Sequence, residues 1–146
     1  MKNLNHIVII DDNKIDCLIN HKIISNSFSI STSKIFNNSV EALDFFNDTK
    51  SEHKILPLFC PDLILLDINM PILNGFDFLK ELAKTSLFLK KPIDVYFLSS
   101  SKNDKDVSKA RETKFSSGYI VKPLTKDKML KAMEFNQNNE SFKMTN

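Results

Sequence analysis

Glycine, cysteine and long apolar runs are all scarce in this chain of 146 residues. The two glycines are Gly75 and Gly118, so no glycine-rich phosphate loop of a nucleotide-binding domain can be drawn. The two cysteines, Cys17 and Cys60, show neither CxxC spacing nor a histidine cluster, which predicts reduced thiols and no zinc site. No stretch approaches the ~20 apolar residues of a membrane span.

Neither the net charge nor the first residues indicate a nucleic-acid or membrane partner. The net charge of +2 at pH 7 is too small to imply nucleic-acid binding by itself. Residues 1–5 lead directly into a strand-like run, without the apolar region and cleavage site of a signal peptide. A length of 146 residues corresponds to one domain. We therefore expect a cytoplasmic protein without a DNA-binding domain.

Strand-like and helix-like segments alternate along the chain. The strand-like runs lie at residues 6–10, 31–36, 63–66, 95–98 and 119–121, and helical spacing follows them at 14–25, 39–46, 76–83, 104–113 and 125–133. This order predicts an α/β fold in which helices cover both faces of a doubly wound, five-stranded parallel sheet. The predicted domain spans residues 4–135, and the polar tail at 136–146 is expected to fray.

The first helix carries a regular apolar pattern. Ile15, Leu18 and Ile19 recur at spacings of three and four residues, and Ile23 follows. Such spacing places these side chains on one side of a helix. The pattern therefore predicts an amphipathic helix.

Charged and hydroxyl side chains stand where the strands end. Asp11 and Asp12 close the first run, Asp67 closes the third, Ser100 follows the fourth, and Lys122 follows the fifth. Because ligands bind at the carboxyl ends of the strands in an open parallel sheet, these side chains are expected to converge. Three carboxylates packed together raise one another's pKa values unless a cation is present. The sequence therefore predicts a cation site.

The predicted cation is Mg²⁺, which prefers oxygen ligands and takes one or two carboxylates together with phosphate oxygens. Asp11 and Asp12 are adjacent and point differently, so one is expected to bind the metal directly and the other through water. Asp67 adds a carboxylate, and the main-chain carbonyl of Asn69 adds another oxygen. An aspartate flanked by Mg²⁺ and a lysine, here Lys122, is an activated nucleophile that can form an aspartyl phosphate.

Four motifs taken together resemble the receiver domain of bacterial response regulators. They are the pair at residues 11–12 (DD) and the runs at 67–75 (DINMPILNG), 98–101 (LSSS) and 119–123 (YIVKP). They occur in the family's order and at about its intervals, and the match covers roughly residues 4–135. The resemblance implies the flavodoxin-like (βα)5 receiver fold, a role in two-component signalling, and Mg²⁺ as cofactor.

For the phosphorylation site, the resemblance implies that Asp67 is the phospho-acceptor. Asp12, Asp67 and the Asn69 carbonyl match the family's Mg²⁺ ligands, and Asp11 matches a supporting acid. Lys122 matches the lysine that pairs with the phosphoryl group. The implied donor is a phosphohistidine on a histidine kinase or a histidine phosphotransfer protein, and hydrolysis of the acyl phosphate resets the switch.

For the switch, the resemblance implies that the phosphoryl group draws in Ser100 and that Tyr119 rotates into the space left behind. This remodels the face made by the fourth predicted helix, the fifth strand and the fifth helix, where a downstream protein is expected to bind. Lys122–Pro123 matches a cis bond of the family. Nine Lys or Arg against four Asp or Glu within residues 102–131 favour an acidic partner there.

Two alternative functions share parts of this pattern. A haloacid-dehalogenase-type phosphatase also uses a strand-end aspartate, Mg²⁺ and a lysine, but it carries a second aspartate two residues on, where this chain has Asn69. A pseudo-receiver scaffold that works without phosphorylation is disfavoured by the intact acid set. We therefore expect a phospho-acceptor switch and no enzyme beyond its own phosphotransfer and dephosphorylation.

The chain departs from the family pattern in two places. Phe115 and Ser116 occupy positions where the family usually carries a small Gly-Ala pair, which predicts a repacked turn before the fifth strand. The connection from Leu82 to Ile93 is a few residues longer than expected. Neither departure touches the predicted phosphorylation site.

Overall fold

The computed structural model describes residues 4–47, 59–137 and 142–146. Their elements in chain order are β1 (Leu4–Ile10), α1 (Lys14–Ser27), β2 (Ile30–Phe36), α2 (Ser39–Asn47), β3 (Leu63–Asp67), α3 (Gly75–Ala83), α4 (Leu87–Lys90), β4 (Asp94–Ser99), α5 (Asp104–Glu112), β5 (Gly118–Val121), α6 (Lys126–Gln137) and β6 (Lys143–Thr145). Among the described helices, none is long and apolar enough to cross a membrane.

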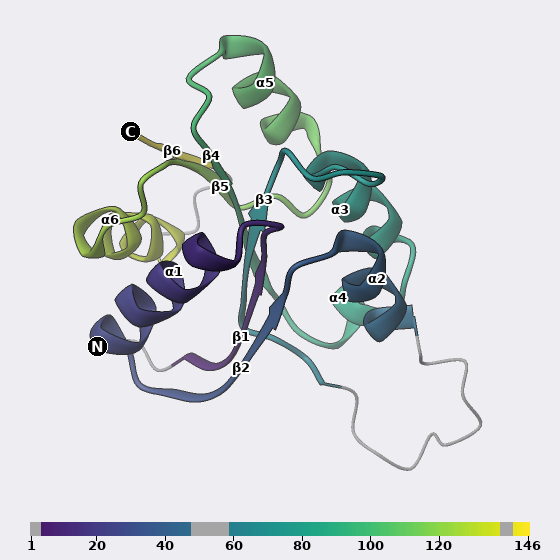
Figure 1. Cartoon of the computed structure of the whole chain (residues 1–146), viewed down its shortest axis with the longest axis horizontal. Helices are drawn as coiled ribbons and strands as arrows, with labels where there is room; N and C mark the ends of the chain where they lie inside the picture. Colours follow the sequence, from purple (N-terminus) through teal and green to yellow (C-terminus); the bar gives the residue numbers. More distant parts are fainter. Residues whose placement is uncertain (1–3, 48–58, 138–141) are drawn as a thin grey trace.

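The strands form one parallel sheet in the order β2-β1-β3-β4-β5-β6. The predicted doubly wound α/β fold is confirmed, because α1 and α6 cover one face and α2 to α5 cover the other (Figure 1). The predicted number of five strands is corrected to six. The additional strand, β6, comes from the tail that was expected to fray, and residues 138–141 of that tail lie outside the described part.

The central strands are apolar on both faces because helices bury both of them. In β1, Val8 and Ile10 point into the core half that packs on α2 and α3, whereas Ile7 and Ile9 point into the half formed with α1 and α6. All four side chains are at most 1% exposed. A continuous apolar run therefore encodes a strand buried on both sides, as expected for a parallel sheet.

The apolar stripe of the amphipathic helix α1 faces solvent and not the sheet. Ile15, Leu18 and Ile19 are 68%, 66% and 52% exposed, whereas Cys17 and Ile24 are buried. The helix carries two sets of residues at helical spacing, and its start decides which set faces inward. Its N-cap is Asn13, whose side chain accepts hydrogen bonds from the first-turn amides, and the Cys17 thiol donates to the Asp11 carbonyl at 3.3 Å. These contacts turn the apolar stripe toward solvent.

The two departures from the family pattern lie next to each other in space. The long connection after α3 contains the short helix α4, whose Phe88 ring stacks on Phe115 with centroids 4.1 Å apart and planes 2° apart. Phe115 has a φ of 70°, a left-handed conformation that is unfavourable for a bulky residue. The stacking stabilises this turn, so the repacking predicted before β5 is present.

Candidate phosphoryl-acceptor site

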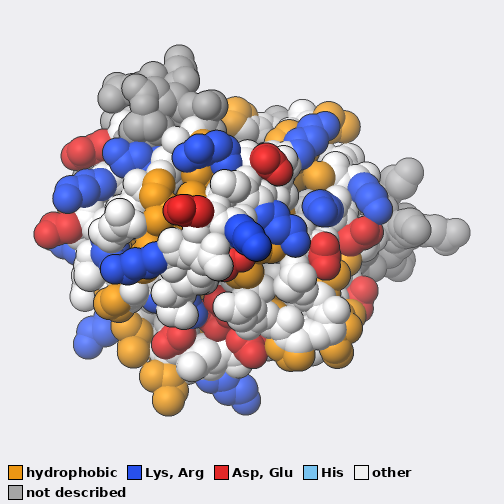
Figure 2. All heavy atoms as spheres, turned by 90° about the horizontal axis from the view of Figure 1, so that it is seen from above, with side chains coloured by type: hydrophobic (Ala, Val, Ile, Leu, Met, Phe, Trp, Pro, Cys, Tyr) orange, Lys and Arg blue, Asp and Glu red, His pale blue; other side chains and the backbone are white. Residues whose placement is uncertain are grey.

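Three carboxylates meet at the carboxyl end of the sheet. Asp11 follows β1 directly, Asp12 is the next residue, and Asp67 ends β3. Each offers a carboxylate oxygen within 4.8 Å of the others, in a grouping suited to a metal ion. Asp11 and Asp67 are buried, whereas Asp12 is exposed. Figure 2 shows the molecule from above, and on this face acidic side chains and lysine or arginine side chains are interspersed.

Lys122 brings a positive charge into the same group. Its Nζ lies 3.0 Å from Asp11 Oδ2 and 3.4 Å from Asp67 Oδ1, although Lys122 and Asp11 are 111 residues apart in sequence. The convergence predicted for the ends of β1, β3 and β5 is therefore present. The Lys122 side chain is 21% exposed, so its ammonium is partly shielded from solvent.

A fourth carboxylate belongs to the site and was missed. Asp16 Oδ2, from the first turn of α1, lies 3.2 Å from Lys122 Nζ. The motifs at the strand ends gave no indication of Asp16, because it lies inside a helix. The available signal was its spacing: it stands one helical turn after Asp12, on a helix that begins next to the site.

Asp11 is held in place by hydrogen bonds that its carboxylate and its main-chain carbonyl accept. The Asn13 amide donates to Asp11 Oδ1 at 2.9 Å. The Asn37 side-chain amide donates to the Asp11 carbonyl at 3.0 Å, and it also contacts the Cys17 sulfur. Burial and the nearby Asp11 carboxylate raise the pKa of Cys17 to about 11, so this thiol stays protonated. Cys17 is thus a structural thiol beside the site.

The charges of the site perturb two pKa values in the same direction. Burial, followed by repulsion from Asp11, raises the pKa of Asp67 to about 6, although Lys122 opposes the shift. Burial alone would lower the pKa of Lys122, but its contacts with Asp11, Asp67 and Asp16 outweigh burial and hold it above the usual value. Lys122 is therefore a permanent cation, whereas Asp67 is ionised at a cost that an added cation would relieve.

Gly75 lets α3 begin against the end of β3. A Cβ on this residue would collide with the main-chain oxygen of Asp67, and the Gly75 amide donates to the Ile68 carbonyl at 2.9 Å. Asn74 caps the helix by accepting a hydrogen bond from the Asp77 amide. The glycine of the sequence motif thus has a steric role beside Asp67 and no chemical one.

The predicted switch residues are Ser100, just after β4, and Tyr119, within β5. Ser100 is the first residue after β4, and Lys122 the first after β5; the preceding residues, Ser99 and Val121, are opposite each other in register. The Ser100 side chain is exposed. Tyr119 is buried, and its hydroxyl donates to the Ser101 carbonyl at 2.8 Å.

Two further predictions concern the main chain near the site. The peptide bond from Lys122 to Pro123 is cis, as predicted. Asn69 lies two residues beyond Asp67, with its side chain exposed. Its proposed carbonyl ligand remains a prediction.

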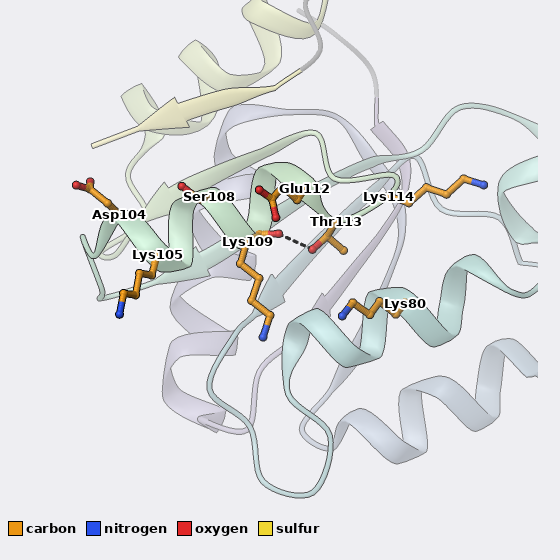
Figure 3. A pocket seen from close by; sticks show the side chains of 8 residues that line it. All are labelled: Lys80, Asp104, Lys105, Ser108, Lys109, Glu112, Thr113 and Lys114. Atoms are coloured by element: carbon orange, nitrogen blue, oxygen red, sulfur yellow. Dashed lines mark hydrogen bonds between the residues drawn. The ribbon is translucent and has the colours of Figure 1, made fainter.

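A separate concavity of about 830 Å³ lies between α3 and α5 and contains none of these acids. Figure 3 shows Lys80 of α3 and Lys109 of α5 facing each other across it. Its complete lining is Lys80, Asp104, Lys105, Ser108, Lys109, Glu112, Thr113 and Lys114. Four lysines against two carboxylates make this groove positive.

Solved structures of response regulators share the fold. A two-component response regulator from Cytophaga hutchinsonii superposes with a TM-score of 0.77 at 24% identity, over 94% of this chain and 99% of that one. A chain of the CheX-CheY-BeF3-Mg+2 complex from Borrelia burgdorferi has a TM-score of 0.68 at 20% identity, over 91% of this chain and 89% of that one. At these identities the likeness concerns the fold alone.

Sequence similarity is more specific than the shared fold. The nitrate/nitrite response regulator protein NarL of Escherichia coli K12 is 37% identical over 73 residues, which are 50% of this chain and 32% of NarL. The chain thus matches about a third of that relative's length. The model of the response regulator receiver domain matches residues 7–134. The chain therefore belongs to the response regulator receiver domain family, whose members are signalling switches of two-component systems.

Proposed function

We propose that this chain is a phosphorylation-gated switch in which Asp67 accepts a phosphoryl group from a phosphohistidine. The observation that carries the proposal is the position of the Lys122 ammonium, 3.4 Å from Asp67 and 3.0 Å from Asp11, within a group of three carboxylates. A fixed cation beside a buried carboxylate suits phosphoryl transfer, which depends mainly on positioning and charge neutralisation.

The transfer exchanges one bond to phosphorus for another. A carboxylate oxygen of Asp67 bonds to phosphorus while the P–N bond to the donor imidazole breaks, and the imidazole leaves with the electron pair and takes a proton from solvent. Lys122 pairs with the oxygens of the transferred group. Later, a water oxygen attacks phosphorus and the bond to Asp67 breaks, which releases inorganic phosphate and restores the carboxylate.

The residues present fit Mg²⁺. Asp12 and Asp67 offer hard oxygen ligands, the Asn69 carbonyl is the proposed third, and Asp11 is proposed to act through water. Burial, followed by repulsion from Asp11, raises the pKa of Asp67, so a cation beside its carboxylate would favour the ionised form and supports this assignment. When bound, the ion neutralises charge on the transferring phosphoryl oxygens.

The exposed stripe on α1 is the proposed docking surface for the phosphodonor. Ile15, Leu18 and Ile19 are more than half exposed on a helix that begins two residues after Asp12, and Ile72, in the loop after Asp67, is 89% exposed. Such apolar side chains around a polar reaction site are typical of a protein-binding surface. A helix of a histidine kinase or phosphotransfer protein that packs on this stripe would bring its phosphohistidine to Asp67.

The proposed response to phosphorylation runs through Ser100 and Tyr119. Ser100 is exposed at the end of β4, free to approach a phosphoryl group on the neighbouring strand. Tyr119 is anchored to Ser101, the next residue, so a movement of this loop reaches the Tyr119 ring directly. The change would remodel the face formed by α5, β5 and α6. The positive groove of Figure 3 borders α5 and favours an acidic downstream protein.

The proposal is tested by incubating the chain with a small phosphodonor and Mg²⁺ and measuring the intact mass. We expect one phosphate per chain in the wild type and none in Asp67→Asn. Asp77→Asn, which alters an exposed carboxylate of α3, is the matched control and should be phosphorylated like the wild type. Uptake by Asp67→Asn, or none by the folded wild type, would refute the proposal. Multiple-turnover hydrolysis of an added phosphomonoester would instead support a phosphatase.

A further inference from the structure

The edge of the sheet beside β5 is occupied by the chain's own C-terminal segment. β6 runs parallel to β5, with Lys143–Thr145 opposite Gly118–Ile120. The Lys143 amide donates to the Ser117 carbonyl at 3.1 Å. Figure 1 shows β6 beside β5, with α6 close to it. Without β6, β5 would present a row of unpaired N–H and C=O groups, which are a template for another strand.

Because Gly118 has no side chain, a second strand can approach this edge of the sheet closely. A Cβ at this position would lie 2.5 Å from the Lys143 carbonyl oxygen and 2.9 Å from the Tyr96 ring. Glycine within a strand often marks a point where another backbone approaches closely. Any side chain here would therefore push β6 away from β5.

Side chains on both sides of β6 add contacts to the main-chain pairing. Phe142 and Met144 pack against the core half that contains Tyr119, and the Phe142 ring centre lies 5.2 Å from the guanidinium carbon of Arg111 on α5. Thr145 is 5% exposed. The edge thus offers an apolar surface that accepts an aromatic and an aliphatic side chain two residues apart.

The docked strand is short and imperfectly matched to its site. It has only three residues, and the buried Thr145 hydroxyl has no hydrogen-bond partner among the described residues. An unsatisfied buried hydroxyl weakens docking. A segment with better side chains can therefore compete for the same edge.

We propose that the β5 edge is a strand-addition site for an extended peptide with an aromatic and an aliphatic residue two positions apart, and that Phe142–Thr145 is its intramolecular occupant. In such sites main-chain hydrogen bonds supply affinity and alternate side chains supply specificity. A partner that adds a strand here must first displace β6. Because β5 belongs to the proposed output face, this competition would regulate output, but the strand-addition site itself does not depend on phosphorylation of Asp67.

The test compares two full-length variants that differ in one hydrogen-bond donor. Lys143→Pro removes the amide that bonds to Ser117, whereas Lys143→Ala keeps it. The probe is a fluorescent peptide with the sequence of residues 140–146, and the measurement is fluorescence anisotropy. Because a tethered strand competes at high effective concentration, we expect Lys143→Pro to bind the peptide at least tenfold more tightly than Lys143→Ala or the wild type. A scrambled peptide should not bind.

Several results would overturn this proposal. Equal affinities for both variants, or no binding to a Lys143→Pro chain that keeps its circular dichroism spectrum, would do so. If Lys143→Pro fails to fold, hydrogen exchange on the wild type decides instead: the amides of residues 143–145 should exchange at least tenfold more slowly than in the free peptide, and equal rates refute docking. A wild-type dimer that Lys143→Pro converts to a monomer would show that β6 docks on a second copy.

Discussion

Replacing the proposed phospho-acceptor should stabilise the metal-free protein. The pKa of Asp67 is raised from 3.8 to about 6, chiefly by burial and then by repulsion from Asp11. A shift of about 2 units corresponds to about 3 kcal/mol of unfavourable free energy for ionising Asp67 in the folded state. Asp67→Asn removes that charge at constant volume, while Lys122 keeps Asp11 and Asp16 as partners. We expect the free energy of unfolding to rise by about 1–3 kcal/mol at pH 7.

The direction of the Asp67 pKa shift determines how the free energy of unfolding changes with pH. Because the folded-state pKa lies above that of the unfolded chain, the wild type loses stability as pH rises from about 4 to about 6. The difference between Asp67→Asn and the wild type should therefore be largest above pH 6 and vanish near pH 4. Urea unfolding without divalent ions, followed by circular dichroism at several pH values, measures it.

The matched control is Asp44→Asn, which alters an exposed carboxylate on α2 away from the site. Its free energy of unfolding should stay within about 0.5 kcal/mol of the wild type at every pH. An Asp67→Asn protein that is less stable than the wild type at pH 7 would refute the reasoning, because Asp67 would then be a net stabilising carboxylate.

Four further outcomes follow from the site. Mg²⁺ at ten times its dissociation constant should stabilise the wild type by about 1.4 kcal/mol in a thermal unfolding assay, and Asp12→Asn should lose most of this. Lys122→Met should destabilise the metal-free chain by about 1–3 kcal/mol, measured by urea unfolding, since the carboxylates lose their shared cation. Gly75→Ala should cost at least about 2 kcal/mol in the same assay, because its Cβ meets main chain. Leu18→Gln should leave stability within about 0.5 kcal/mol but slow phosphotransfer from a histidine kinase, with labelling by a small phosphodonor unchanged.

Much of the sheet and of the acidic site was predictable because each depends on strong local signals. Strands buried on both faces require continuous apolar runs, and the parallel arrangement then brings Asp11, Asp67 and Lys122 to one edge without further information. The packing side of α1 was not predictable from spacing, since two sets of residues share the helical period and the cap at Asn13 selects between them. Asp16 was missed because it lies inside a helix and not at a strand end.

The sequence of β6 shows no pattern that predicts a strand. The strand has only three residues, Lys143–Thr145, and their polarity is too mixed to show the alternation of apolar and polar residues that is typical of a strand. It forms because β5 offers an open edge and Gly118 leaves space for a neighbouring backbone. Such a strand is determined by the tertiary structure that precedes it, so local sequence patterns alone cannot reveal it.

The central claim is that one buried carboxylate, held between an acidic cluster and a lysine, carries a labile acyl phosphate. Treating the phosphorylated wild type with hydroxylamine and mapping the products by peptide mass spectrometry locates that bond directly. We predict a hydroxamate at Asp67 alone, formed only when Mg²⁺ was present during phosphorylation. A hydroxamate at Asp11, Asp12 or Asp16, or a phosphate on serine or histidine with Asp67 unmodified, would contradict the account.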